Sequence, residues 1–283
     1  MEAAYPLDLH VHSTFSDGRL SPAQLCAEAA RQGIELLSLC DHDTLSGLEP
    51  MAQAARENSL TFVPSVELGS GPSARLHILG YGVNPACDEL QDLLRRLAAQ
   101  RRERMQKMLA LLARQGVRID PTELPPSASS SRAHLAAALV RHGAAGSVAE
   151  AFDRFLAEGR CAYVPRTVPT AAQATALLRR AKAVPVLAHP VRLGLSPGEV
   201  HALVRELKTA GLAGVEAYHP SANPEEARRL ESMARAEGLL VTGGSDFHGD
   251  GTHARMGYMP EGWVRAPQDA RALCQAVNVS NKA

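Results

Sequence analysis

The sequence predicts an α/β protein with a mostly parallel sheet and a helical segment inserted in the middle of the chain. Strand and helix patterns alternate over most of the 283 residues. Residues 95–165 interrupt this alternation, because they show helical patterns and no convincing strand. Hydrophobic residues make up 45% of the chain, which is enough for a sizeable core. Seven strands arranged in this way form a mostly parallel sheet that is either open or closed into a barrel.

The seven expected strands are short apolar runs, and a helix signal follows most of them. Such a succession is typical of parallel sheets, whose strands need a crossover connection. We expect the strands at Tyr5–His10, Leu36–Cys40, Thr61–Glu67, Arg75–Tyr81, Val184–Ala188, Gly214–Ala217 and Leu239–Gly243.

The first connecting helix has clear boundaries. Ser21 is the expected N-cap, with Pro22 at the first helical position and Gln24 completing a capping box. Gly33 ends the helix. The other helices of the α/β part are expected at Leu48–Asn58, Pro197–Ala210, Pro224–Glu237 and Pro267–Val277.

The inserted segment begins with a long helix, expected from Asp88 to Gln115. Apolar residues recur there at helical spacing: Leu93, Leu94, Leu97, Met105, Met108, Leu109 and Leu112. A Ser-rich loop and a second helix follow. We assign residues 1–94 and 166–283 to the α/β part and residues 95–165 to the insertion. The insertion holds 12 Lys and Arg against six Asp and Glu, a net charge of +6 in a chain of net charge zero.

Composition excludes several classes of protein. A net charge of zero argues against a globally basic nucleic-acid binder. No apolar run approaches the ~18 residues of a membrane span, and the N-terminus lacks the pattern of a signal peptide. The five cysteines are scattered without a C-x-x-C pair, so we expect reduced thiols and a cytoplasmic protein.

Side chains that bind metals occur at or near the carboxyl-terminal ends of all seven expected strands. They are His10, His12, Asp17, Asp41, His42, Glu67, His77, His189, Glu216, His219, Asp246 and His248. A single histidine on a strand is more often a hydrogen-bonded core residue, but that explanation would have to hold seven times. In α/β barrels the carboxyl ends of the strands form the active site. Without cations, so many carboxylates and imidazoles would repel or lie unpaired. The sequence therefore predicts a cluster of divalent cations, and the nitrogen and oxygen donors suit Mn²⁺, Zn²⁺ or Fe²⁺.

Six motifs occur in a familiar order: "DLHVHSTFSDG", "DHDT", "PSVELGS", "HILGY", "LAHPVR" and "GSDFHG". In order and spacing they resemble the PHP (polymerase and histidinol phosphatase) superfamily, over Leu7–Gly82 and Val184–Gly249. The resemblance implies a distorted (β/α)7 barrel, similar to a TIM barrel, that hydrolyses phosphoesters. It also implies two or three divalent metal ions, with Mn²⁺ expected and Zn²⁺ or Fe²⁺ as alternatives.

The resemblance assigns nine residues to three ions. His10, His12, Glu67 and Asp246 would hold the first, Glu67, His77 and His189 the second, and Asp17, His42 and His248 the third. Four further acids would orient the ligating imidazoles, with a hydrogen bond to a local turn as the alternative for each: Asp8, Asp41, Asp43 and Glu216. His219 and His253 are further candidates because they lie near the same face by sequence.

The expected reaction is hydrolysis of a phosphomonoester. A hydroxide bridging the metals would attack phosphorus in line, and no nucleophile motif such as G-x-S-x-G is present. Asp246 and His189 are both candidates for protonating the leaving oxygen, and the sequence does not choose between them.

Basic residues are candidates for binding a second, non-reacting phosphate: Arg101, Arg102, Arg104, Arg132, His134 and Arg192. Arginine binds phosphate bidentately, and the start of the helix near Arg132 offers backbone N–H groups. The pair Arg132 and His134 resembles an "R-P-H"-like segment in the insertion of one PHP subgroup, with Ala133 in place of the proline. For most basic residues of the insertion, a solvated helix face is the alternative.

That subgroup resembles nucleotide phosphoesterases, so we expect a small phosphorylated nucleotide as substrate. The leading expectation is removal of the 3′-phosphate from a nucleoside 3′,5′-bisphosphate, which gives a nucleoside 5′-monophosphate and phosphate. Aromatic residues make up only 4% of the chain, which argues against a long stacking platform and a stable nucleic-acid partner. The alternatives are a 5′-3′ exoribonuclease or oligoribonucleotidase acting on short RNA, a histidinol-phosphate phosphatase, and a non-catalytic metal-binding module.

Overall fold

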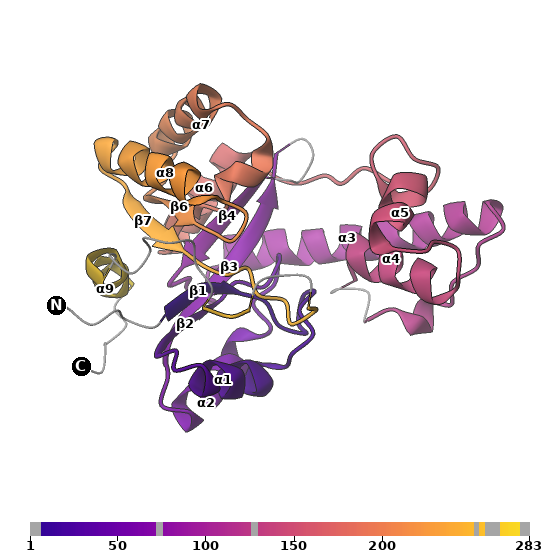
Figure 1. Ribbon diagram of the computed structural model, residues 1–283, viewed down its shortest axis with the longest axis horizontal. Coiled ribbons are helices and arrows are strands. Elements are labelled where there is room, and N and C mark those ends of the chain that lie inside the picture. Colours follow the sequence, from indigo (N-terminus) through magenta and orange to yellow (C-terminus); the bar gives the residue numbers. More distant parts are fainter. Residues whose placement is uncertain (1–6, 72–75, 126–129, 252–254, 258–266, 278–283) are drawn as a thin grey trace. The chain divides into compact units, whose positions relative to one another are not determined.

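The computed structural model describes two compact units. The described residues are 7–71, 76–125, 130–251, 255–257 and 267–277. Unit 1 comprises residues 1–91 and 169–283, and unit 2 comprises residues 92–168 (Figure 1). Both boundaries lie three residues outside those expected from the sequence. None of the described helices is long and apolar enough to cross a lipid bilayer.

Unit 1 is built on a seven-stranded sheet whose strands follow one another in chain order. They are β1 (Leu7–Val11), β2 (Leu36–Leu39), β3 (Thr61–Ser70), β4 (Leu76–Tyr81), β5 (Val184–Leu187), β6 (Gly214–Tyr218) and β7 (Leu240–Gly243). We call the place where β1 meets the segment that follows β7 the seam. There the N–H of His12 donates to the carbonyl of Phe247 at 2.9 Å, and the N–H of Phe247 donates to the carbonyl of His10 at 3.3 Å. The sheet is therefore nearly closed, which confirms the expected barrel.

The direction of β4 corrects one expectation. β4 is antiparallel to both β3 and β5, whereas the other neighbouring pairs are parallel. His77 therefore lies near the beginning of its strand, where it pairs with Gly69 of β3, and not at a carboxyl end. Because β4 is reversed, its beginning lies at the end of the barrel where the other strands finish. His77 therefore still lies at the end of the barrel where the other metal-binding side chains are expected.

The described helices of unit 1 pack against its strands or against one another. They are α1 (Pro22–Arg31), α2 (Leu48–Glu57), α6 (Ala171–Arg180), α7 (Pro197–Thr209), α8 (Pro224–Ala236) and α9 (Pro267–Ala276). α1 packs on α2, α6 on β4 and β5, and α8 on β6 and β7 (Figure 1). A short 3₁₀ turn, Pro190–Leu193, follows β5. The predicted cap of α1 is confirmed, since Ser21 Oγ accepts from Gln24 N–H and Gln24 Oε1 accepts from Ser21 N–H.

Unit 2 is helical in its described residues. It contains most of α3 (Asp88–Arg114), then a 3₁₀ turn (Pro121–Glu123), α4 (Arg132–Arg141), α5 (Val148–Ala151) and a π-helical turn (Phe152–Leu156). These elements enclose a core of their own: Met105, Met108, Leu112, Ile119, Leu124, Leu135, Ala136, Ala138, Leu139, Ala145, Ala151, Phe155, Leu156 and Ala162. Of the apolar positions that predicted α3, Met105, Met108 and Leu112 thus contribute to a separate hydrophobic core.

Gly244, directly after β7, permits a close approach at the seam. A Cβ at this position would lie 2.1 Å from His10 Cβ and 2.6 Å from His10 N. We expect Gly244→Ala to lower the free energy of unfolding by about 1–3 kcal/mol, since the strands must separate to admit the methyl group. Urea denaturation would measure the change. Gly198→Ala on α7 is the control, because nothing lies within 4 Å of its added Cβ. Equal stability of the two variants would contradict the prediction.

Candidate metal centre

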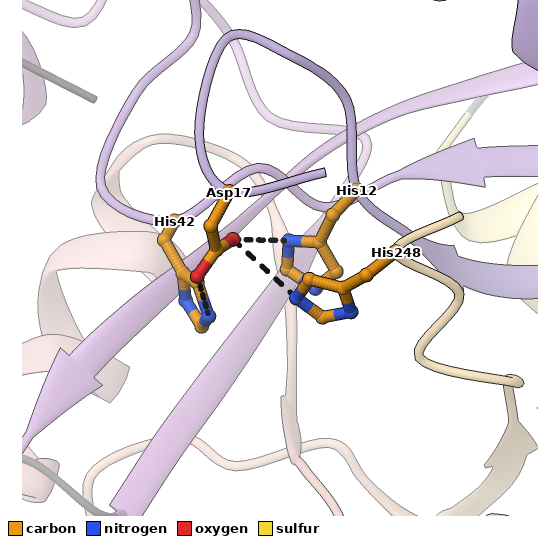
Figure 2. Close-up of side chains that lie close together, drawn as sticks. All are labelled: His12, Asp17, His42 and His248. Carbon is orange, nitrogen blue, oxygen red and sulfur yellow. Dashed lines mark ion pairs between the residues drawn. The ribbon is translucent and has the colours of Figure 1, made fainter. Parts of the chain in front are cut away.

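The expected metal ligands gather at one end of the barrel. Eight of the nine fall into three overlapping groups, within each of which the donor atoms all lie within 4.8 Å of one another. The groups are His10, His12, Glu67 and Asp246; His12, Asp17, His42 and His248; and His42, Glu67 and His77. Figure 2 shows the second group, with the Asp17 carboxylate between the three imidazoles. His189, the ninth residue, also contacts this cluster, with Nε2 3.0 Å from Glu67 Oε1.

Glu67 is central to the cluster. Its Oε2 atom lies 3.3 Å from the Nε2 atoms of both His10 and His12 and 3.0 Å from His42 Nδ1. Its Oε1 atom lies 2.7 Å from His77 Nδ1. The two oxygens of one carboxylate thus face different sets of imidazoles, which is the arrangement that a bridging ligand requires.

Buried donor atoms of the cluster lack hydrogen bonds. Among the described residues, His10 Nε2, His12 Nε2, Asp17 Oδ1 and Glu67 Oε2 are buried without a hydrogen-bond partner. Buried polar atoms are normally satisfied, so each such atom needs an explanation. Divalent cations would satisfy all four. The donors are imidazole nitrogen and carboxylate oxygen without thiolate, which fits Mn²⁺, Zn²⁺ or Fe²⁺.

Glu216 on β6 is the acid that positions histidines directly. Its Oε1 atom accepts from His10 Nδ1 at 2.9 Å, and its Oε2 atom accepts from the backbone N–H of His189 at 2.8 Å. The hydrogen on His10 Nδ1 leaves the lone pair of Nε2 directed at the cluster. One buried carboxylate therefore orients two of the expected ligands.

The hydrogen bonds described for the other three acids are with backbone N–H groups and serine hydroxyls. Asp8 accepts from the N–H groups of Ser245 and Gly257, at 2.9 and 2.7 Å, and so ties β1 to the segments after β7. Asp41 accepts from the N–H and hydroxyl of Ser13 and from the hydroxyl of Ser16. The Asp43 carboxylate accepts from Gly69 N–H at 3.1 Å.

Strained backbone marks three of the strand ends. Asp43, His189 and Asp246 have φ values of 53°, 27° and 53°, in the left-handed region that non-glycine residues rarely adopt. Conformations of this kind cost about 1–3 kcal/mol each and persist where surrounding contacts enforce them. The Glu216 hydrogen bond to His189 N–H is one such contact.

Charges within the cluster shift its pKa values. Burial raises the pKa of Glu67 and of Asp246, but neighbouring imidazoles outweigh burial and hold both pKa values well below the usual range. Burial alone would lower the pKa of His12, yet its contacts with Asp246 and Glu67 raise it to about 10. Burial lowers the pKa of His42 to about 3. In the metal-free protein near pH 7, His12 therefore carries an extra proton and His42 does not.

Metal binding should therefore release protons. A cation that takes His12 Nε2 must displace the proton held below pH 10, so apparent metal affinity should rise about tenfold per pH unit for each proton displaced. Adding Mn²⁺ to metal-free protein near pH 7, in weak buffer with an indicator dye, would measure the release. K⁺ at equal ionic strength is the control. An affinity independent of pH between 6 and 9 would contradict the prediction.

The basic residues of unit 2 include a compact group that the sequence only partly indicated. Burial lowers the pKa of Arg104 to about 10, and the nearby guanidinium groups of Arg132, Arg166 and Arg101 act in the same direction. The Arg132 guanidinium lies 5.6 Å from the ring centre of Phe152 and 5.9 Å from that of Tyr163. We call Arg101, Arg104, Arg132 and Arg166 the arginine cluster. The sequence analysis did not select Arg166, which lies one position after the expected insertion and belongs to no motif.

The remaining substrate-binding candidates lie in different settings. Arg102 is exposed. His134 Nδ1 accepts from Ser131 N–H at 3.0 Å and so takes part in the cap of α4. Arg192, in unit 1, donates to Asp246 Oδ2 at 2.7 Å. His219 lies beside Asp246, and His253 falls outside the described residues.

Comparisons with known proteins agree with this geometry. The family described as "PHP domain" matches residues 8–160. A 5′-3′ exoribonuclease of Haemophilus influenzae is 30% identical over 281 residues, 97% of this chain and 98% of that protein. A 3′,5′-nucleoside bisphosphate phosphatase of Chromobacterium violaceum is 31% identical over 259 residues, 88% and 89% of the two chains.

A solved structure shows the same fold. A Chromobacterium violaceum protein described as an amidohydrolase, with bound sulfate and no metal, superimposes with a TM-score of 0.83 at 30% identity. The match covers 90% of this chain and 91% of that one. Family match, relatives and fold agree with the donor cluster at the end of the barrel. The chain therefore belongs to the PHP domain family of metal-dependent phosphoesterases.

Proposed function

We propose that this protein hydrolyses the 3′-phosphate of nucleoside 3′,5′-bisphosphates at a cluster of two or three divalent cations. The observation that carries the proposal is the set of three overlapping donor groups joined through His12, His42 and Glu67. Several adjacent cations suit hydrolysis of a phosphoester, where charge develops on both the entering and the leaving oxygen.

Counting lone pairs restricts how His12 and His42 can be assigned. A neutral imidazole offers one lone pair, so His12 and His42 can each bind only one ion although each occurs in two groups. His12 Nε2 lies 3.1 Å from Asp246 Oδ1, whereas His12 Nδ1 lies 3.8 Å from Asp17. We therefore assign His12 to the first ion. His42 Nδ1 lies 3.0 Å from Glu67 Oε2 and its Nε2 lies 3.9 Å from Asp17 Oδ2, so these distances do not assign His42 to the third ion. For His42 and the other ligands we propose the assignment that the PHP resemblance implies: His10, His12, Glu67 and Asp246; Glu67, His77 and His189; and Asp17, His42 and His248.

The bound cations would polarise the phosphoryl oxygens and lower the pKa of an attacking water. The side chains of the cluster would hold these cations in place. Asp246 and His189 were candidates for proton transfer, but both contact the cluster and we propose ligand roles for them. Arg192 is a candidate for contacting the reacting phosphate, since its guanidinium contacts Asp246.

A substrate with two phosphates is supported by the charge of unit 2. The arginine cluster concentrates positive charge, and guanidinium groups match the geometry of phosphate oxygens. We propose that unit 2 binds the phosphate that does not react. The bisphosphate phosphatase among the relatives supports this substrate class.

Degradation of short RNA from the 5′ end is the second candidate. The relative named 5′-3′ exoribonuclease matches over nearly the whole length of both chains, and the same cations would serve. In that case the arginine cluster would bind the backbone of the strand. Histidinol phosphate has a single phosphate and a cationic amine, so it is poorly matched to an insertion of charge +6.

Phosphate release in the presence of Mn²⁺ tests the proposal. Adenosine 3′,5′-bisphosphate would be compared with AMP, histidinol phosphate and a 5′-phosphorylated trinucleotide. We expect rapid release from the bisphosphate, with 5′-AMP as the nucleotide product. Faster degradation of the trinucleotide would favour the nuclease, and no turnover of any substrate would overturn the assignment.

A further inference from the structure

His219, just after β6, is a buried histidine at the metal centre that belongs to none of the three donor groups. Its side chain is only 4% exposed, and its ring centre lies 5.2 Å from that of His189. Its Nε2 atom lies 3.6 Å from Asp246 Oδ2, beyond hydrogen-bonding distance. Among the described residues, Nε2 has no hydrogen-bond partner.

The other nitrogen of His219 fixes the position of the ring hydrogen. The backbone N–H of Ser221 donates to His219 Nδ1 at 3.0 Å. A nitrogen that accepts a hydrogen bond carries a lone pair and no hydrogen. The neutral imidazole therefore carries its hydrogen on Nε2, the atom that faces the cluster.

Two of the expected ligands show the opposite arrangement. His10 Nδ1 contacts the Glu216 carboxylate at 2.9 Å, and His248 Nδ1 contacts the backbone carbonyl of Asp246 at 2.7 Å. Both partners only accept hydrogen bonds, so in each histidine the hydrogen lies on Nδ1 and the lone pair on Nε2. His10 and His248 are thus prepared to bind cations through Nε2, whereas His219 presents N–H.

We propose that His219 does not bind a metal and instead donates a hydrogen bond from Nε2 to a phosphoryl oxygen of the substrate. An N–H donor placed where negative charge develops stabilises the transition state without reorganisation. The Ser221 hydrogen bond keeps the ring in this orientation before substrate binds. The proposal deepens the proposed phosphatase function and rests on it for the identity of the acceptor.

Metal content and the ring tautomer test the first half without any substrate. We expect His219→Ala to bind as many Zn²⁺ or Mn²⁺ ions as the unchanged protein, measured by elemental analysis after gel filtration. A two-bond ¹H–¹⁵N spectrum of the Zn²⁺ form should show the His219 hydrogen on Nε2. Loss of one ion, or a hydrogen on Nδ1, would overturn the proposal.

Phosphate binding and turnover test the second half. His219→Ala should weaken inorganic phosphate binding by calorimetry and lower kcat for p-nitrophenyl phosphate by about 100-fold, as for loss of one oxyanion donor. His219→Gln, whose amide also donates, should recover part of this loss. His201→Ala is the control, because His201 on α7 pairs with Glu237, the residue that follows α8, and neither belongs to a donor group.

Each failure has a distinct signature. Unchanged turnover and phosphate binding in His219→Ala would overturn the donor role while leaving the phosphatase intact. An unchanged protein that is inactive on every phosphoester would overturn the proposed function, while metal content, tautomer and phosphate binding would still decide the role of His219.

Discussion

Glu67→Gln is expected to reduce phosphate release by roughly a thousandfold and to lower the number of bound cations. The carboxylate lies within 3.3 Å of five imidazoles and is the only ligand in our assignment shared by two ions. The neutral amide of glutamine lacks the negative charge and the second oxygen with which the carboxylate would bridge two cations. Cations supply several kcal/mol of charge stabilisation in the transition state, and about 4 kcal/mol corresponds to roughly a thousandfold in rate. Elemental analysis and release of phosphate from adenosine 3′,5′-bisphosphate would measure both effects.

Two further variants distinguish the loss of a bridging ligand from the loss of a negative charge elsewhere in the protein. Glu225→Gln removes an exposed carboxylate that pairs with Arg229 on α8, and should leave metal content and turnover unchanged. Glu216→Gln disturbs the orientation of His10 without removing a ligand, and should reduce metal affinity about 10- to 100-fold. If Glu67→Gln kept its full complement of cations and its rate, Glu67 would not be a bridging ligand.

Arg104→Gln is expected to raise KM for adenosine 3′,5′-bisphosphate by about 10- to 100-fold. A charge-assisted hydrogen bond to phosphate contributes about 1.5–3 kcal/mol. The half-buried Arg104 guanidinium is oriented by its bond from Nε to the Val164 carbonyl at 2.7 Å. Nucleoside 3′-monophosphate lacks the second phosphate, so its turnover should change little. Initial rates with both substrates would provide the comparison.

Arg114→Gln is the matched control for Arg104→Gln. Arg114 is an exposed arginine in the same helix, α3, and falls outside the arginine cluster. Its replacement changes the charge of unit 2 by the same amount, so an equal effect would indicate long-range attraction and not a binding site. Equal losses on the bisphosphate and the 3′-monophosphate would likewise contradict a role in binding the second phosphate.

Local patterns predicted the strands, the helices and the donors at the strand ends, whereas closure of the sheet into a barrel was implied by the PHP resemblance. Apolar runs, caps and turn residues identify strands and helices, and a donor such as Glu67 or His189 then follows from its position in the strand. The fold class and family were confirmed on this basis. The reversal of β4 was missed because strand direction depends on which strands pair, and His77 looks the same in either direction.

The roles of individual acids and bases were harder to predict for a similar reason. Asp41 and Glu216 both follow or occupy strands, yet one holds the serines of the loop after β1 and the other orients His10. The hydrogen on His219 depends on a single backbone N–H two residues away. Arg166 joins Arg104 only through the folding of unit 2, 62 positions apart in the printed sequence. Such contacts depend on tertiary structure and leave no periodic signal.

The contact between β1 and the segment after β7 bears on the stage of synthesis at which the proposed cations could bind. His10 belongs to the first strand, whereas Asp246 and His248 follow the last, and the Asp8–Ser245 contact spans 237 positions. A ribosome makes the early histidines long before the later carboxylate exists. The full set of donors that we propose for the first ion therefore exists only after Asp246 has been synthesised. We therefore expect the proposed site to take up the ions that are present once this last segment has folded against β1.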